Sequence, residues 1–155
     1  MKYKPKTREE LKSLVDNLSI NLSDIDTSAI TDMSDLFFDS WRKDFSGIES
    51  WNVSNVANMS GMFKYCKKFN QPLSDWNVSS VTDMSGMFAY CYDFNQPLNN
   101  WDVSSVTGMH EMFDGCENFN QPLDSWNVSS VTNMSRMFYN CKINDKNKPK
   151  FTNMQ

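Results

Sequence analysis

Residues 76–100 have the sequence WNVSSVTDMSGMFAYCYDFNQPLNN, and closely similar runs of the same length come directly before and after them. The period is marked by tryptophans at positions 51, 76, 101 and 126 and by cysteines at positions 66, 91, 116 and 141. A constant period of about 20 to 50 residues is typical of proteins in which each repeat buries its apolar side chains against its neighbours. The sequence therefore predicts a row of stacked repeats.

The repeat sets the predicted organisation of all 155 residues. An imperfect copy begins at Ile25 with Ser40 in the cysteine position, and its connector, Trp41 to Ser50, departs from the pattern. We expect an N-terminal capping helix and linker over 1–24, a repeat region over 25–141 and a C-terminal tail over 142–155. Within the repeat region we expect a divergent first unit, three regular units and a partial unit: 25–50, 51–75, 76–100, 101–125 and 126–141.

Part of each repeat has the spacing of a short helix. Met59, Met62, Phe63 and Cys66 stand at positions i, i+3, i+4 and i+7, which share one face of an α-helix. We expect that face to point into the core. In most copies a serine follows the first methionine of this spacing, where its hydroxyl is expected to cap the first turn: Ser60, Ser85 and Ser135.

Two other stretches of the repeat alternate as extended chain does, and short strands are expected over residues 69–73 and 76–81. If repeats stack about 4.8 Å apart, as strands do, equivalent side chains form ladders of Trp on Trp, Phe on Phe and Met on Met. Asparagine amides are expected to pair between repeats in the same way, at Asn70, Asn95 and Asn120. The directions of three glutamine side chains stay open: Gln71, Gln96 and Gln121.

The two ends of the row look different. Thr7 and Glu10 form a capping box, and an apolar stripe follows on a helix predicted over residues 8–18, made of Leu11, Leu14, Val15 and Leu18. We expect this helix to cover the first repeat. After Cys141 the FNQPL run is missing, and lysines stand at 146, 148 and 150 instead. That end is expected either to be solvated or to be a place where another chain docks.

Composition excludes two classes of function. The formal net charge of −4 and the pI near 4.9 argue against general nucleic-acid binding. No apolar run approaches the roughly 18 residues needed to cross a membrane, so no membrane insertion is expected. The basic start, MKYKPK, is not followed by the apolar segment of a signal peptide.

The residues most prone to be mistaken for a chemical site are all explained by the repeat. The cysteines form no C-x-x-C pair and have no histidines at ligand spacing, so buried thiols are favoured over a zinc site, with disulfides between repeats as an alternative. The methionines at helical spacing are expected in the core. His110 is the only histidine and no nucleophile is arranged beside it. We expect no catalytic residue, no cofactor and no metal site, and hence no enzyme.

VTDMSGMF at 81–88, the cysteine at 91, FNQPL at 94–98 and WDVS at 101–104 together resemble the BspA-like leucine-rich repeat family, also called DUF285 or the mycoplasma-lipoprotein type repeat. The resemblance covers residues 25–141. It implies an α/β repeat fold: a right-handed, leucine-rich-repeat-like solenoid of about five 25-residue coils, each with short strands and a short helix. It also implies bacterial surface or secreted proteins of adhesive type, without catalytic residues to carry over. Because no signal peptide, lipobox cysteine or wall anchor is apparent, cell-surface and cytoplasmic locations both stay open.

Function is expected where the repeat fails: at the positions that vary between otherwise constant repeats, because packing does not fix them, in the divergent first unit around Trp41 and in the unfinished last repeat. Net charge differs sharply between units, at +2 for 51–75, −2 for 76–100, −5 for 101–125 and +4 for 126–150. Aromatic residues beside charges are typical interface anchors. The candidate partner-binding surface comprises Lys64, Tyr65, Lys67, Lys68, Tyr90, Tyr92, Asp93, Asp114, Glu117 and Tyr139.

The leading hypothesis is a non-enzymatic scaffold that binds a host or bacterial protein through one face of the row. A second hypothesis is self-assembly through the incomplete C-terminal repeat, with the protein otherwise a monomer or weakly self-associating. A third is a glycan-binding module that uses the exposed tyrosines and polar side chains.

Overall fold

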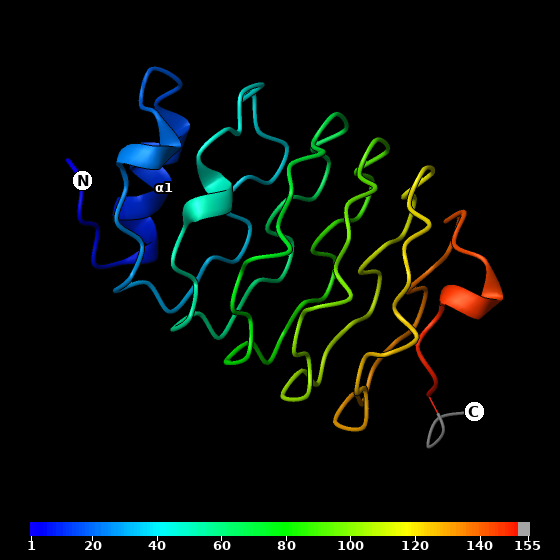
Figure 1. The fold of residues 1–155 in the computed structure, drawn as a ribbon. Helices are drawn as coiled ribbons and strands as arrows, with labels where there is room; N and C mark the ends of the chain where they lie inside the picture. Colours follow the sequence, from blue (N-terminus) through cyan, green and yellow to red (C-terminus); the bar gives the residue numbers. More distant parts are fainter. Residues whose placement is uncertain (152–155) are drawn as a thin grey trace.

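The computed structural model describes residues 1–151, and in it the repeats lie side by side in sequence order between the two termini (Figure 1). One α-helix, α1 (Arg8–Asp16), stands at the N-terminal end. Three single 3₁₀ turns follow: η1 (Leu22–Asp24), η2 (Ile48–Ser50) and η3 (Asp145–Asn147). Between residues 1 and 151 no strand forms, and parallel pairing is limited to isolated bridges such as Asp83 with Gly108.

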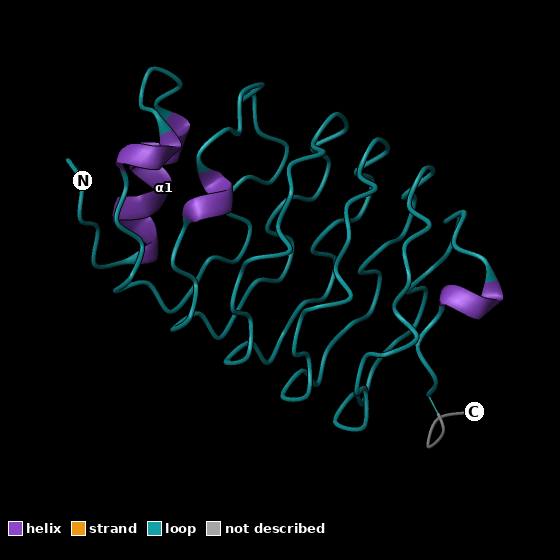
Figure 2. Ribbon diagram, viewed as in Figure 1, coloured by secondary structure: helices purple, strands orange, loops and turns teal. Residues whose placement is uncertain are grey.

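The predicted leucine-rich-repeat-like solenoid, with short strands and a short helix in every coil, is therefore wrong. Residues 69–73 and 76–81 form no strand, and the expected helix around Met59 to Cys66 is a series of turns (Figure 2). The turns are closed by hydrogen bonds from Met62 N to Met59 O (3.3 Å) and from Cys66 N to Phe63 O (2.9 Å). Two successive turns bring the same four side chains inward as a helix would, and all four are buried.

Left-handed backbone is what excludes the helix. In the repeat at 51–75, Gly61 has φ +62° and Tyr65 has φ +66°. The two equivalent positions are also left-handed in all the remaining copies of the repeat. An α-helix needs right-handed residues throughout, and a left-handed L-residue costs roughly 1–2 kcal/mol. At Gly115, φ is +73° and a Cβ atom would lie 2.5 Å from the Tyr90 ring, so this turn needs glycine for two reasons.

Backbone hydrogen bonds between repeats replace the missing strands and helices. Alternate N–H groups of one repeat donate to carbonyls of the next, for example Phe63 N to Met87 O (2.9 Å) and Phe88 N to Met112 O (3.0 Å). The N–H groups in between close the turns within their own repeat. Nearly every backbone donor of this segment is thereby satisfied without regular secondary structure.

The core consists of side-chain ladders along the row, as predicted. Phe63 and Phe88 stack with ring centroids 5.8 Å apart, and Trp76 and Trp101 stack at 6.5 Å. Each such aromatic pair contributes roughly 0.5–1.5 kcal/mol beyond area burial. The indole N–H groups of the ladder donate to carbonyls 28 or 29 residues earlier in the chain, as in Trp101 Nε1 to Leu73 O (2.9 Å).

Two Asx turns explain the recurrent polar residues of each repeat except 101–125, where Gly108 replaces the second Asn or Asp. Asn77 Oδ1 accepts hydrogen bonds from the N–H and the hydroxyl of Ser79, at 3.1 and 2.7 Å. Asn58 Oδ1 does the same for Ser60, at 2.9 and 2.8 Å. Ser60 therefore donates to its neighbour instead of capping a helix, and the predicted capping role of these serines is wrong.

The asparagine row pairs between repeats, and it also fixes two of the glutamines. Asn95 N donates to Asn70 Oδ1 at 2.9 Å, and Gln96 Nε2 donates to the Asn70 carbonyl and side chain, both at 3.1 Å. Gln121 repeats this pattern on Asn95. These glutamines point back along the row, toward the N-terminal neighbour.

Helix α1 covers the N-terminal edge of the row. Thr7 caps it by accepting from Glu10 N, and Leu11 and Val15 are buried against the first repeat. The helix ends at Asp16, so Leu18 lies beyond it and is 53% exposed. The prediction that the helix and its apolar stripe extend to Leu18 is therefore wrong. No helix among the described residues is both long and apolar enough to cross a membrane.

Candidate functional site

The variable positions lie together along one edge of the row, because they occupy equivalent places in successive repeats. Tyr65 and Tyr90 stack at 4.9 Å with nearly parallel rings, and Phe38 meets Tyr65 edge-on at 5.5 Å. Gly115 takes the next position of this aromatic row and interrupts it, and Asn140 follows in the last repeat. Tyr139 occupies the position equivalent to Lys64 instead, under the guanidinium of Arg136 at 4.0 Å. Of the ten candidate residues, six are exposed: Tyr65, Lys67, Lys68, Asp93, Glu117 and Tyr139. Three are half-buried: Lys64, Tyr90 and Tyr92. One, Asp114, is buried.

Asp114 was expected on the surface, but the structure places its side chain in the interior. Its side chain is 2% exposed and its Oδ2 lies 3.4 Å from Nε of Arg136, while Oδ1 has no partner among the described residues. Its negative charge is the main cause of a raised pKa at Tyr90. Asp114 thus anchors Arg136 in the next repeat instead of facing a partner directly.

Tyr92 and Glu117 line a shallow hollow of about 620 Å³ that also includes Lys142. Acidic and basic side chains are mixed there, and its apolar surface is small. The hollow lies between neighbouring repeats, and its lining side chains do not form a chemical site.

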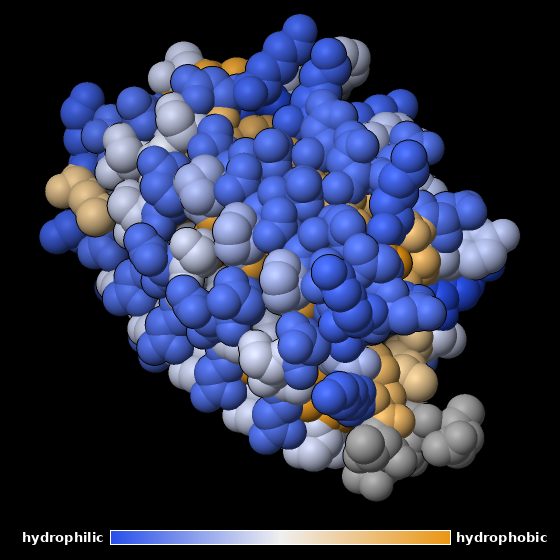
Figure 3. All heavy atoms as spheres, turned by 45° about the vertical axis from the view of Figure 1, so that its right-hand side comes forward, coloured by the Kyte–Doolittle hydropathy of each residue, from blue (hydrophilic) through white to orange (hydrophobic). Residues whose placement is uncertain are grey.

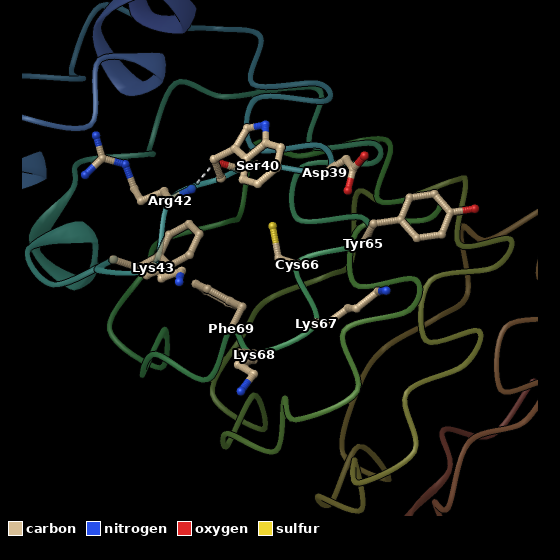
Figure 4. Close-up of a pocket in the computed structure, with 11 residues that line it drawn as sticks. Asp39, Ser40, Arg42, Lys43, Tyr65, Cys66, Lys67, Lys68 and Phe69 are labelled. Carbon is tan, nitrogen blue, oxygen red and sulfur yellow. Dashed lines mark hydrogen bonds between the residues drawn. The ribbon is translucent and has the colours of Figure 1, made fainter.

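A deeper pocket of about 480 Å³ lies where the first repeat breaks the period. Its walls come from the connector after Ser40 and from the turn at Tyr65–Phe69 in the next repeat (Figure 4). Phe45 and Phe69 are buried and form apolar walls, whereas Trp41 at the rim is 86% exposed. A tryptophan so exposed leaves a large apolar side chain in water, which is unusual for a residue without a partner.

Three lysines and one exposed carboxylate, that of Asp39, line this pocket. Lys43 comes from the connector, and Lys67 and Lys68 come from the repeat that faces it; all three are exposed. In Figure 4, Lys67 and Lys68 extend outward from the pocket on the side opposite Arg42. The ion pairs found among the described residues include none of these three lysines. Their charge is therefore available to an acidic partner.

Arg42 holds the connector in place from behind. Its side chain turns away from the pocket and donates to three carbonyls at the end of α1 and in the following loop: Val15 (3.0 Å), Asn17 (3.1 Å) and Ile20 (3.2 Å). Burial lowers the pKa of this guanidinium from its usual value. The pocket thus has a fixed wall, with Trp41 directly beside an anchored residue.

Cys66 lies at the bottom of the pocket, where Figure 4 shows its sulfur directed inward. The thiol donates to Phe37 O at 3.0 Å, and burial raises its pKa to about 12. Since the thiolate is the reactive form of cysteine, this geometry disfavours a nucleophile. Cys91 and Cys116 repeat the same thiol-to-carbonyl contact at 2.9 Å and are buried free thiols, as expected.

The ten candidate residues do not include Trp41, Lys43 or Phe45, although the sequence points to the divergent first unit around Trp41 as a whole. The signal that marks them is the break in the period: Ser40 replaces cysteine, and the connector replaces FNQPL. Variation between the regular repeats indicates individual residues only at equivalent positions, such as the tyrosine row, and the irregular connector has no equivalent in the other repeats. Among residues 1–151 no group of three or more metal-ligating side chains is found.

The family follows from a comparison with family models. The model described as "Mycoplasma protein of unknown function, DUF285" matches residues 9–107 and 31–151. The chain belongs to the DUF285 family. Searches of curated proteins and of solved structures gave no match. The suspected relationship is thereby confirmed, and the function of this family is not established.

Proposed function

We propose that this DUF285 chain is a non-enzymatic binding module, and that its pocket at Trp41 takes a protein segment with an apolar anchor flanked by acidic residues. The observation that carries the proposal is the 86% exposed Trp41 at the rim of a pocket with Phe45 and Phe69 in its walls. Burying an indole of this size is a main source of affinity at protein interfaces.

Charge sets the kind of partner. Lys43, Lys67 and Lys68 surround the apolar pocket. They attract acidic side chains and repel basic ones, which favours specificity and rapid association. Tyr65 extends the contact area toward the stacked Tyr90. This arrangement is that of an interface centre, with an aromatic anchor and a charged rim.

A random peptide library displayed on phage and selected on the full chain tests the proposal. We expect the enriched peptides to share one large apolar residue beside Asp or Glu, and their affinity to fall about 30-fold with Trp41→Ala, because hot-spot tryptophans contribute about 2 kcal/mol or more. The double variant Lys67→Glu, Lys68→Glu should also weaken binding, and more strongly at low salt.

The matched control is Leu18→Ala, which removes an exposed apolar side chain outside the pocket. It should leave peptide affinity unchanged. Enriched peptides that bind wild type and Trp41→Ala equally, or that lack acidic residues, would refute the proposal. Selection of sugars on a glycan array, with the same dependence on Trp41, would favour the glycan-binding alternative instead.

A further inference from the structure

The row of repeats has a direction in its hydrogen bonding. In the turn segment of each inner repeat, alternate N–H groups point toward the C-terminal neighbour, as Gly86 N does to His110 O at 2.8 Å. The carbonyls of those same residues are used inside the turns, as Gly86 O is by Ala89 N at 3.1 Å. This segment therefore offers donors on its C-terminal side and carbonyls on its N-terminal side.

Helix α1 satisfies two of the four carbonyls at the N-terminal edge. Arg8 Nε donates to Ser34 O at 2.6 Å, and Lys12 Nζ donates to Leu36 O at 3.1 Å. The equivalent carbonyls in the next repeat, Ser60 O and Met62 O, accept backbone N–H groups of the first repeat instead. Basic side chains on one helix face thus replace a missing neighbour.

The C-terminal edge has the opposite chemistry, and no α-helix among residues 1–151 covers it. Four N–H groups equivalent to the inner donors have no backbone acceptor among residues 1–151: those of Met134, Arg136, Phe138 and Asn140. The carbonyls of the first three accept from N–H groups within the turns. By analogy with the inner repeats, two carbonyls of this edge face outward. Thr132 O is equivalent to Thr107 O, which accepts from Thr132 N, and Phe138 O is equivalent to Phe88 O, which also accepts from the Cys116 thiol.

Apolar surface and positive charge accompany these donors. Met134 and Phe138 are only partly buried, whereas their counterparts in the inner repeats are fully buried. Lys148 lies 5.7 Å from the Phe138 ring and Phe151 packs against the core, so the tail covers part of this end. Figure 3, which brings this end forward, shows apolar surface at its lower right. The unit 126–150 has a net charge of +4.

We infer that this C-terminal edge, defined by residues 134–140, binds an amphipathic helix of another protein that carries Asp or Glu at positions i and i+4. The spacing follows from the other end: Arg8 and Lys12 are four apart on a helix, about 6 Å, and meet carbonyls two residues apart. Carboxylates four apart would meet alternate N–H donors in the same manner, by charge-assisted hydrogen bonds. Apolar residues between them would cover Met134 and Phe138.

The same chemistry disfavours a second copy of this chain as the occupant. Two C-terminal edges would place four backbone donors against four, with only the Thr132 and Phe138 carbonyls of each to accept. The N-terminal edge of another copy is closed by α1, whose Leu11 and Val15 are buried against the first repeat. Self-association through this end is thus the weaker alternative, and an acidic helix is the stronger one.

The test is a titration of the full chain, labelled with ¹⁵N, by a hydrocarbon-stapled peptide of residues 7–18 carrying Arg8→Glu and Lys12→Glu. We expect the amide signals of Met134, Arg136, Phe138 and Asn140 to shift, and those of Gly86 and Phe88 to stay in place. The stapled peptide of unaltered sequence is the control, and it should produce no shift because its basic groups face donors.

Two results would overturn the inference. The first is an absence of shifts at residues 134–140 at millimolar concentrations of the acidic peptide, or equal shifts with both helices. The second is a shift with an unstapled peptide of residues 76–100 but not with the acidic helix, which would show that the edge takes an extended repeat. Because the site at Trp41 is not involved, either result leaves the proposed function standing.

Discussion

Phe88→Ala is expected to lower the free energy of unfolding by about 3–5 kcal/mol, the range measured for phenylalanine removed from well-packed cores. Phe88 is fully buried in the middle of the row. Its ring stacks on Phe63, Phe94 and Phe113 at 5.8, 4.2 and 5.6 Å. Its loss would leave a cavity that opens both neighbouring interfaces at once. Urea unfolding followed by circular dichroism measures the change.

Phe138→Ala is the matched control, because it removes the same ring from the last repeat. Phe138 is only partly buried and stacks along the ladder on Phe113 alone, at 5.7 Å. We expect about half the loss seen for Phe88→Ala. Equal losses at the two positions would mean that the ladder does not carry the stability of the row.

Arg42→Ala should lower the free energy of unfolding by about 3 kcal/mol. Its guanidinium donates to the carbonyls of Val15, Asn17 and Ile20, and each buried carbonyl left without a donor costs about 1–3 kcal/mol, with the exposed ones recovering water. Arg42→Lys should recover only part of this, because one ammonium lacks the planar fork that reaches several acceptors. Thermal unfolding gives the comparison.

Lys43→Ala controls for charge, since Lys43 is exposed directly beside Arg42. It should change the free energy of unfolding by no more than about 0.5 kcal/mol, as surface substitutions do. A similar small effect for Arg42→Ala would contradict the structural role given to this residue. Peptide binding at Trp41 should weaken with Arg42→Ala, because the connector that carries Trp41 loses its anchor.

Sequence periodicity identified the inward-facing side chains of the repeat but not its backbone. Met59, Met62, Phe63 and Cys66 are buried as expected, yet they lie on successive turns and not on a helix. Spacing at i, i+3, i+4 and i+7 fits both arrangements. The difference depends on left-handed residues such as Tyr65, and a tyrosine carries little propensity for that conformation.

The alternating pattern of residues 69–73 and 76–81 predicted strands that do not form, because strand pairing depends on the neighbouring repeat as well as on local sequence. A single bridge per interface, as at Asp83 and Gly108, needs the neighbouring repeat to form, so it is invisible to local propensity. The ladders of identical side chains could be predicted because every repeat supplies the same residue at the same place. The candidate site was only partly predictable. The exposure of Trp41 depends on the conformation of its connector, and no other repeat contains an equivalent segment from which that conformation could be predicted.

Amide hydrogen exchange measured residue by residue tests the central claim, that repeats are held together by alternate N–H groups directed to the next repeat. Gly86, Phe88 and Tyr90 donate to His110, Met112 and Asp114 and should exchange slowly. Their equivalents in the last repeat, Arg136, Phe138 and Asn140, should exchange fast. Fast exchange at 86, 88 and 90, or protection at 136, 138 and 140 equal to theirs, would contradict the account.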